Sequence, residues 1–259
     1  MEICSKRIYM CEDSVDGIFT AVYLAWSSGF GHDNVKLEVQ SNEKGYNNIE
    51  LFSEYISVST DLNLSLRVSK AIKEKISSEA YEAAIRTALS NHIGKADVIY
   101  RFLILGFRFG SSILERLSNE IVMTVFKVNK YVNGEVHHLL GFVRFSQQEG
   151  GWLTSVIHPK NNVLALITPH FADRLPNESF VIYDANRKLA SVHMPGRQWI
   201  IAGLSDFNSN ELDLSQEEDE YKGLWKAFFK SIVIKERTNK ALQRNNLPNR
   251  FRGDMTEFL

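Results

Sequence analysis

The feature that most constrains the fold is a change of hydrophobic periodicity near Gly134. Before it, apolar residues recur three and four positions apart, as in helices that pack by one face. After it, short alternating stretches are separated by turn residues, as in strands and hairpins. Strands that gather after a helical block favour an α+β fold with a mostly antiparallel sheet of hairpins. The helical segments are expected at residues 66–76, 78–89, 96–107 and 111–132.

The first forty residues predict one strand followed by one helix. A strand is expected at residues 3–11, and Asp13 and Ser14 then offer side-chain oxygens for a helix N-cap. Glycines at 29 and 31 end this helix. The polar stretch that follows is expected to be loop, apart from a short alternating piece at residues 35–39.

The second half of the chain predicts hairpins and a long C-terminal helix. A short helix between the hairpins has Thr168 as its expected cap and Pro169 at its first helical position. From Tyr221 onward the spacing is again helical. No linker interrupts the sequence, so we expect a single domain over residues 1–259. The strands are expected at residues 139–145, 152–157, 179–184, 189–194 and 198–204.

Composition excludes several classes of protein. With 44% hydrophobic residues and a formal net charge of -1, the chain is neither disordered nor uniformly basic. Two cysteines seven residues apart form no disulfide framework, and no segment resembles a signal peptide or a membrane span, so we expect a cytoplasmic protein. Common catalytic and cofactor motifs are absent, and the histidines lack the spacing of metal ligands. We therefore predict no metal and no cofactor, and leave open whether the chain is an enzyme.

The C-terminal segment has a strongly uneven charge. Seven acids lie between Asp206 and Glu220, and nine basic residues then face three acids, so the overall neutrality is a cancellation. On a helix, six of these cations fall within an arc of about 80° and extend over roughly 30 Å. Such a basic stripe can follow a DNA phosphate backbone, and a solvated helix face explains it equally well. The stripe comprises Lys222, Lys226, Lys230, Arg237, Lys240 and Arg244.

Three candidate catalytic residues come from strand and helix starts. Asp16 follows the first strand at a helix N-terminus, where carboxylates suit the helix dipole and where active sites also occur. The predicted strand at 139–145 places Arg144 among aromatic residues, where it can hold a phosphate or stack on a base. His137 lies at the start of that strand on the opposite face. The alternative is a snorkelling arginine with two edge histidines.

Three further candidates lie later in the chain. His170 is at helical spacing from Asp173 and Arg174, so a carboxylate can orient its imidazole for acid–base chemistry. A surface ion-pair ladder explains this pattern as well. Asp184 and Arg187 flank the second hairpin turn, and their alternative role is to stabilise that turn.

Taken together, these motifs resemble a bacterial family labelled "probable DNA metabolism protein", whose domain otherwise has no known function. The resemblance extends over nearly the whole chain. The chain departs from the family after Asp61, where Ser65-Leu66 stands in place of a Lys-Ala pair. The matching stretches are residues 13–18, 21–23, 60–61, 67–68, 135–137, 141–145 and 169–174, Asp184 with Arg187, residues 224–226, 228–229 and 236–237, Asn239, Pro248 and Arg250.

The resemblance implies a DNA-associated component that acts with a radical-SAM partner in DNA repair or modification. Members of the family accompany such a protein, and some are fused to a uracil-DNA-glycosylase-like domain. Two alternatives stay open: a non-catalytic adaptor that docks the radical-SAM enzyme, and a base-lesion-processing enzyme of the glycosylase or lyase type. The second alternative requires His170 or Asp16 to meet Arg144 and Asp184 in one pocket.

Overall fold

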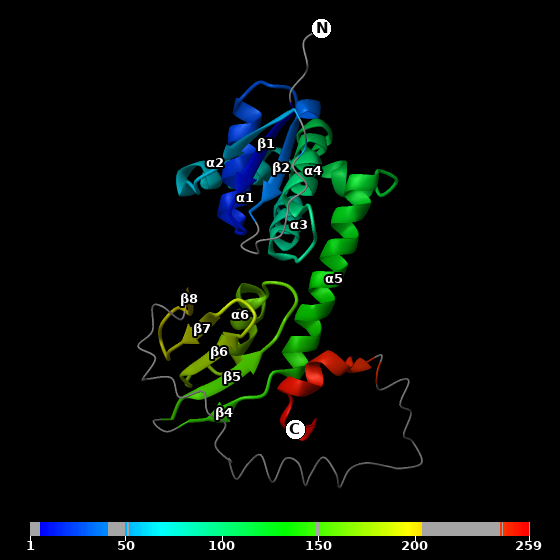
Figure 1. Cartoon of the computed structure of the whole chain (residues 1–259). Coiled ribbons are helices and arrows are strands. Elements are labelled where there is room, and N and C mark those ends of the chain that lie inside the picture. The colour runs from blue at the N-terminus through cyan, green and yellow to red at the C-terminus, as the bar shows by residue number, and fades with distance from the viewer. Residues whose placement is uncertain are drawn as a thin grey trace. The chain divides into compact units, whose positions relative to one another are not determined.

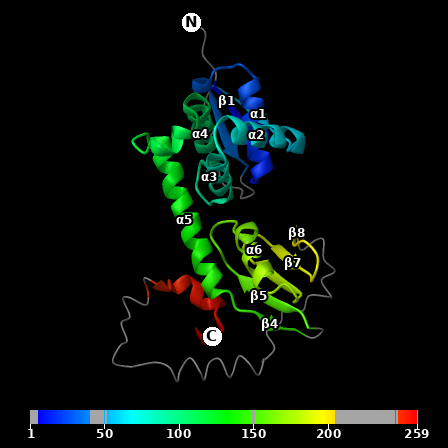
Figure 2. The same cartoon turned by 180° about the vertical axis from the view of Figure 1, so that it is seen from behind.

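A computed structural model of the chain describes residues 6–40, 50, 52–148, 151–203, 244 and 246–258. The chain divides into two compact units, Met1–Val132 and Asn133–Leu259. Both units are drawn in Figure 1 and, from behind, in Figure 2, and helix α5 (Glu120–Phe142) begins in the first and ends in the second. Helices and strands are mixed along the chain, which confirms the predicted α+β class.

The first unit contains a three-stranded parallel sheet in the order β2-β1-β3. Tyr9 of the central strand lies opposite Leu37 on one side and Ile56 on the other. β1 and β2 confirm predicted strands. β3 is not evident from the sequence, because it is largely exposed and lacks a regular apolar alternation. The strands are β1 (Lys6–Cys11), β2 (Val35–Val39) and β3 (Ser53–Ser57).

Four helices and two 3-10 helices precede α5 in the described part of the first unit. Ser14 confirms the predicted N-cap, since its Oγ accepts a hydrogen bond of 2.9 Å from the Gly17 N–H. Position 17 requires glycine because a Cβ there would lie 2.7 Å from the carbonyl oxygen of Glu12. The helices are α1 (Val15–Ser27), α2 (Leu62–Lys75), α3 (Ser78–Leu89) and α4 (Lys95–Phe109), with η1 (His32–Asn34) and η2 (Gly110–Glu115).

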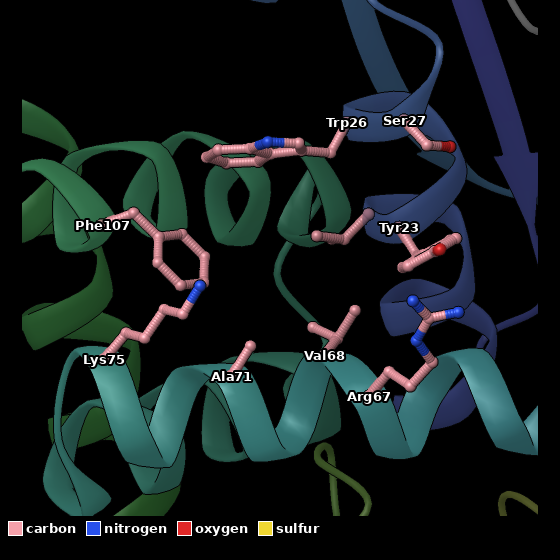
Figure 3. A pocket seen from close by; sticks show the side chains of 9 residues that line it. Tyr23, Trp26, Ser27, Arg67, Val68, Ala71, Lys75 and Phe107 are labelled. Carbon is pink, nitrogen blue, oxygen red and sulfur yellow. The ribbon is translucent and has the colours of Figure 1, made fainter.

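Helix α4 both packs on the sheet and protects its edge. Asp97 Oδ1 accepts a hydrogen bond of 3.2 Å from the Leu37 N–H, and the Arg101 guanidinium donates to the Val35 carbonyl at 2.6 Å. These side chains satisfy backbone groups of β2 that would otherwise be open to another strand. α1, α2 and α4 also enclose a pocket, lined in part by Trp26 (Figure 3).

The second unit is built on a five-stranded sheet in the order β4-β5-β6-β7-β8. β5 and β6 are parallel and are connected through α6, whereas the other neighbouring strands are antiparallel. α6 packs against β6 and β7 around a core that includes Phe171, Phe180 and Ile182. The elements are β4 (Ser146–Gln147), β5 (Leu153–Ile157), α6 (Leu164–Arg174), β6 (Phe180–Asp184), β7 (Leu189–His193), β8 (Ile200–Gly203), η5 (Asn249–Asp254) and η6 (Thr256–Phe258).

The predicted strand at 139–145 is wrong, because α5 continues to Phe142. Val132, Glu135, Leu139 and Val143 are buried at spacings of three and four residues. A helix aligns such positions on one face, whereas a strand does not. The hairpin of β6 and β7 and the last strand, β8, are confirmed.

Two further expectations need correction. α6 begins at Leu164, so Thr168 is not its cap; the Thr168 hydroxyl instead donates to the Leu164 carbonyl at 2.7 Å. Pro169 lies inside the helix, where it removes one backbone donor. The sheets also contain more parallel pairing than expected, since the first is wholly parallel and the second includes the parallel β5–β6 pair.

The expected C-terminal helix lies almost wholly outside the described residues. Arg244 is helical and exposed. None of the described helices combines the length and hydropathy that crossing a bilayer requires. The stripe residues outside the description are Lys222, Lys226, Lys230, Arg237 and Lys240.

Candidate functional site

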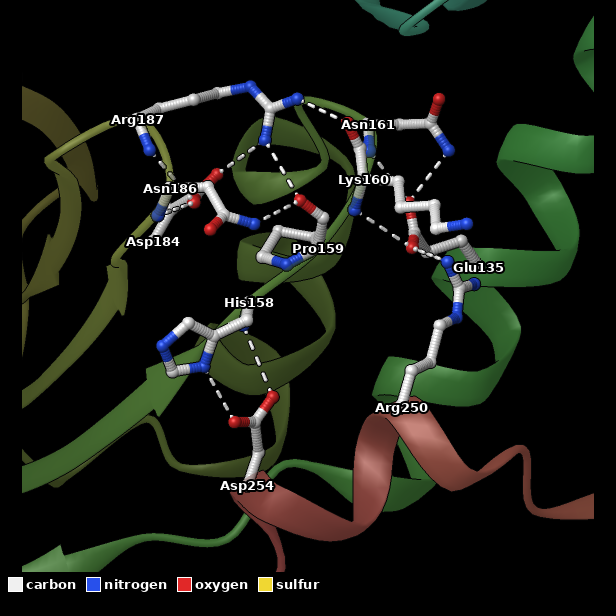
Figure 4. A network of polar contacts seen from close by, with 10 residues as sticks. All are labelled: Glu135, His158, Pro159, Lys160, Asn161, Asp184, Asn186, Arg187, Arg250 and Asp254. Carbon is white, nitrogen blue, oxygen red and sulfur yellow. Dashed lines mark hydrogen bonds and ion pairs between the residues drawn. The ribbon is translucent and has the colours of Figure 1, made fainter.

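A network of polar contacts lies at the carboxyl ends of the parallel strands β5 and β6 (Figure 4). β5 is followed by residues 158–161, and β6 ends at Asp184. Adjacent parallel strands end at the same edge of a sheet, and ligands commonly bind at such edges in α/β proteins. The remaining members come from α5, which provides Glu135, and from η5, which provides Arg250 and Asp254.

Asp184 and Arg187 organise the turn after β6. Asp184 is fully buried, and its carboxylate accepts hydrogen bonds from the Asn186 and Arg187 N–H groups at 3.0 and 3.2 Å. It also forms an ion pair of 3.0 Å with the Arg187 guanidinium. Arg187 also donates to the carbonyls of Pro159 and Lys160 at 3.2 and 2.5 Å. These contacts tie the β6–β7 turn to the segment that follows β5. Asp184 and Arg187 therefore have the turn-stabilising role that the sequence allows, and they also link two loops.

Glu135 of α5 organises the other side of the network. Its carboxylate accepts hydrogen bonds from the Lys160 and Asn161 N–H groups at 3.0 and 2.8 Å and from the Asn161 side chain at 2.7 Å. Arg250 adds an ion pair of 2.9 Å. The Glu135 side chain is completely buried, so these donors replace the water that would otherwise solvate its charge.

Three arginine–carboxylate ion pairs and one histidine–aspartate contact in the second unit share one pattern, in which the carboxylate is shielded and its basic partner reaches solvent. The acidic side chains are between 0 and 11% exposed, whereas their partners are between 26 and 51% exposed. A cation held by a buried carboxylate is ordered before any ligand arrives, which lowers the entropy cost of binding. The pairs are Glu135–Arg250, Asp184–Arg187, Asp254–His158 and Glu257–Arg144.

The surface of the described part of the second unit is consequently positive. It contains nine lysines and arginines against six aspartates and glutamates, and four of those acids belong to the shielded pairs. Only two acids, Asp173 and Glu178, are exposed in this part of the chain. Exposed cations that form no ion pair with a described carboxylate are Lys160, Arg174, Lys188, Arg197 and Arg244.

An aromatic cluster fixes η5 on the end of α5. His138 stacks on Phe142 at a centroid distance of 5.5 Å and contacts Phe251 at 5.4 Å. Burial, followed by the neighbouring charges of His137 and Arg250, lowers the pKa of His138 below its usual value. The lowered pKa is consistent with the apolar surroundings of this ring, which contacts both Phe142 and Phe251.

The six candidate catalytic residues occupy different parts of the structure. Asp16 belongs to the first unit, where its carboxylate accepts a hydrogen bond of 2.6 Å from the Ser65 hydroxyl and thereby links α1 to α2. His137 is exposed on α5, and His170 is exposed on α6 with its ring edge against Phe171. Arg144 follows α5 and pairs with Glu257. The remaining two, Asp184 and Arg187, are joined in the network of Figure 4.

Several network members are not among the candidates chosen from sequence. Glu135, Asn161 and Asp254 resemble ordinary polar residues, and their partners lie 25 to 115 residues away. Glu135 and its partner Arg250 are both among the residues on which the sequence resemblance is based. Within the described residues, no group of three or more histidines, cysteines or acids is arranged to hold a metal ion.

Comparison with known proteins identifies one family. Residues 94–257 match the model of a family described as "Domain of unknown function (DUF4130)". The matched range covers more than half of the chain and contains every residue of the network in Figure 4. No curated protein matches the chain.

Proposed function

The chain belongs to the DUF4130 family, a domain of unknown function, and we propose that it is a DNA-associated component that acts with a radical-SAM partner in DNA repair or modification. The observation that supports DNA association is the excess of lysines and arginines over exposed acids in the described part of the second unit. Buried carboxylates orient its cations, and few exposed acids oppose them. The radical-SAM partner is proposed from the sequence resemblance.

The charge pattern suits a phosphate backbone better than a small anion. Lys160 and Lys188 are exposed residues of the two segments that Arg187 ties together, so neighbouring segments carry both a cation held in an ion pair and cations with no described carboxylate partner. In sequence, the stripe that ends at Arg244 adds five more cations. Each phosphate that a cation neutralises releases counterions, so many modest contacts add up to measurable affinity at low salt.

The test is fluorescence anisotropy with a labelled DNA duplex at NaCl concentrations from roughly 50 to 300 mM, a range in which phosphate contacts respond to salt. Log affinity should fall linearly with log salt, by about 0.9 for each phosphate contacted. Simultaneous reversal of Lys226, Lys230 and Arg237 to glutamate should reduce the slope by about 3, and Lys160→Ala and Lys188→Ala by about 1 each.

Lys127→Ala is the matched control, because this lysine is exposed on α5 in the first unit. It should leave the salt slope unchanged. A flat salt response of the natural chain, or an unchanged affinity of the triple variant, contradicts the proposal. Co-purification with a radical-SAM protein in the absence of any DNA affinity would favour the adaptor role instead.

A further inference from the structure

The pocket of the first unit has the form of a slot bordered by three helices. It has a volume of about 690 Å³, and its lining residues come from α1, α2 and α4. In Figure 3 the ring of Trp26 lies across the slot from Val68 and Ala71 of α2. Small side chains thus form one wall and an indole face the other. The size falls within the range of small-molecule sites, roughly 300–1,000 Å³.

Trp26 is exposed yet held in place. It retains 40% of its accessible surface, although its neighbours are aromatic. The Phe107 ring meets it edge-on at 5.2 Å, and the His32 ring lies 4.7 Å from it. An indole whose orientation is fixed by such contacts is a ready stacking surface for another planar ring.

A cation stands at each end of the slot. Arg67 lies over the Tyr23 ring at 4.9 Å, and Lys75 extends beside Phe107 (Figure 3). Both cations are on one face of α2, eight residues and hence about 12 Å apart along its axis. Neither forms an ion pair with a carboxylate in the described parts of the chain, whereas Lys70 of the same helix pairs with Glu74.

We propose that this slot binds a nucleotide, with the base stacked on Trp26 and its phosphate held by Arg67 or Lys75. An apolar, flat-walled centre with positive ends matches a planar ring that bears an anionic group. The same chemistry is offered by a free nucleoside monophosphate and by a nucleotide within single-stranded DNA. The site belongs entirely to the first unit, so it is independent of the duplex contact proposed for the second.

The test is calorimetric titration of the full chain with three probes: deoxyadenosine monophosphate, a single-stranded oligo(dA), and 2-deoxyribose 5-phosphate, which lacks the base. The nucleotide should bind and the sugar phosphate should not. Trp26→Leu should weaken nucleotide binding about tenfold, as expected for loss of one base–aromatic stack. Ala71→Leu should do the same by filling the slot while leaving Trp26 and its contacts intact.

Charge variants on α2 provide the matched comparison. Lys75→Ala or Arg67→Ala should weaken binding by about fivefold, and Lys70→Ala should have no effect. If oligo(dA) binds far more tightly than the monophosphate, with the same dependence on Trp26, the natural ligand is a strand; equal affinities indicate a free nucleotide. The inference is overturned if the nucleotide does not bind, if the sugar phosphate binds as well, or if binding survives in both folded slot variants, Trp26→Leu and Ala71→Leu.

Discussion

At the scale of single residues, the burial of Glu135 makes its contacts necessary for the stability of the second unit. Its carboxylate accepts four hydrogen bonds or ion pairs with no exposure of the side chain. If the carboxylate is removed, two backbone N–H groups and the Asn161 amide lose their acceptor, and Arg250 loses its counter-charge. Unpaired groups of this kind are costly in a protein interior.

We predict that Glu135→Ala lowers the free energy of unfolding by about 3–5 kcal/mol. Urea denaturation followed by circular dichroism measures the change. Glu178→Ala is the control, because Glu178 is exposed in the same unit; its effect should stay within about 0.5 kcal/mol. Equal effects of the two substitutions would show that the Glu135 contacts do not stabilise the fold.

Cys11 gives a prediction about alkaline pH. Desolvation by burial raises the pKa of this thiol from 9.0 to about 12. Between these values the unfolded chain releases the proton and the folded chain keeps it, so the folded state loses stability as pH rises. We predict an added loss of up to about 1.4 kcal/mol per pH unit above pH 9, relative to Cys11→Ala. Parallel pH dependences of the two proteins would contradict this assignment.

At the scale of elements, local signals were sufficient where a helix or turn is determined by nearby residues. Ser14 caps α1. Asp184 and Arg187, which are only three positions apart, stabilise a turn together. The strand expected at 139–145 failed because its short window of apolar residues fits both periods. Positions 132, 135 and 139 are buried at helical spacing, so the choice between helix and strand becomes clear only when the whole of α5 is considered.

The network itself could be predicted only in part. Asp184 and Arg187 were candidates because their spacing is short. Glu135 and Arg250 are 115 residues apart, and no periodicity relates two positions at that separation. Such a pair becomes visible only when the β5–α6–β6 crossover and η5 have been placed in space.

Replacing a glycine by alanine should have opposite effects on stability in two of the helices. No atom outside its own turn lies within 4 Å of a Cβ built at Gly134 of α5, so Gly134→Ala should stabilise by about 0.5–1 kcal/mol. At Gly17 of α1 the Cβ would meet the Glu12 carbonyl oxygen at 2.7 Å, and Gly17→Ala should destabilise by about 1–3 kcal/mol. Thermal unfolding of both variants tests the pair. A shift of the same sign in both would contradict it.

At the scale of the whole molecule, the two units have separate apolar cores. The first includes Phe19, Ile72 and Phe102, and the second includes Ile167 and Phe180. Substitutions whose contacts lie in different cores share no partner. Their effects on stability should therefore add.

We predict that Gly17→Ala and Glu135→Ala, combined in one chain, destabilise by the sum of their separate effects within about 0.5 kcal/mol. Denaturant titrations of the two single variants and the double variant complete the thermodynamic cycle. A coupling well above this margin would mean that the two sites interact energetically. Additivity would identify them as independent contributors to stability.

The pairing of Glu135 with Arg250 also has a consequence for synthesis of the chain. The ribosome adds Arg250 115 residues after Glu135, which takes roughly 6–23 s at ordinary elongation rates. Throughout that interval the acid is made but its cation is not, while the core residues of the first unit have already been translated. The first unit can fold early, whereas the second must wait for η5. Codon usage upstream of Arg250 is thus a means of setting how long an incomplete second unit is exposed to chaperones and proteases.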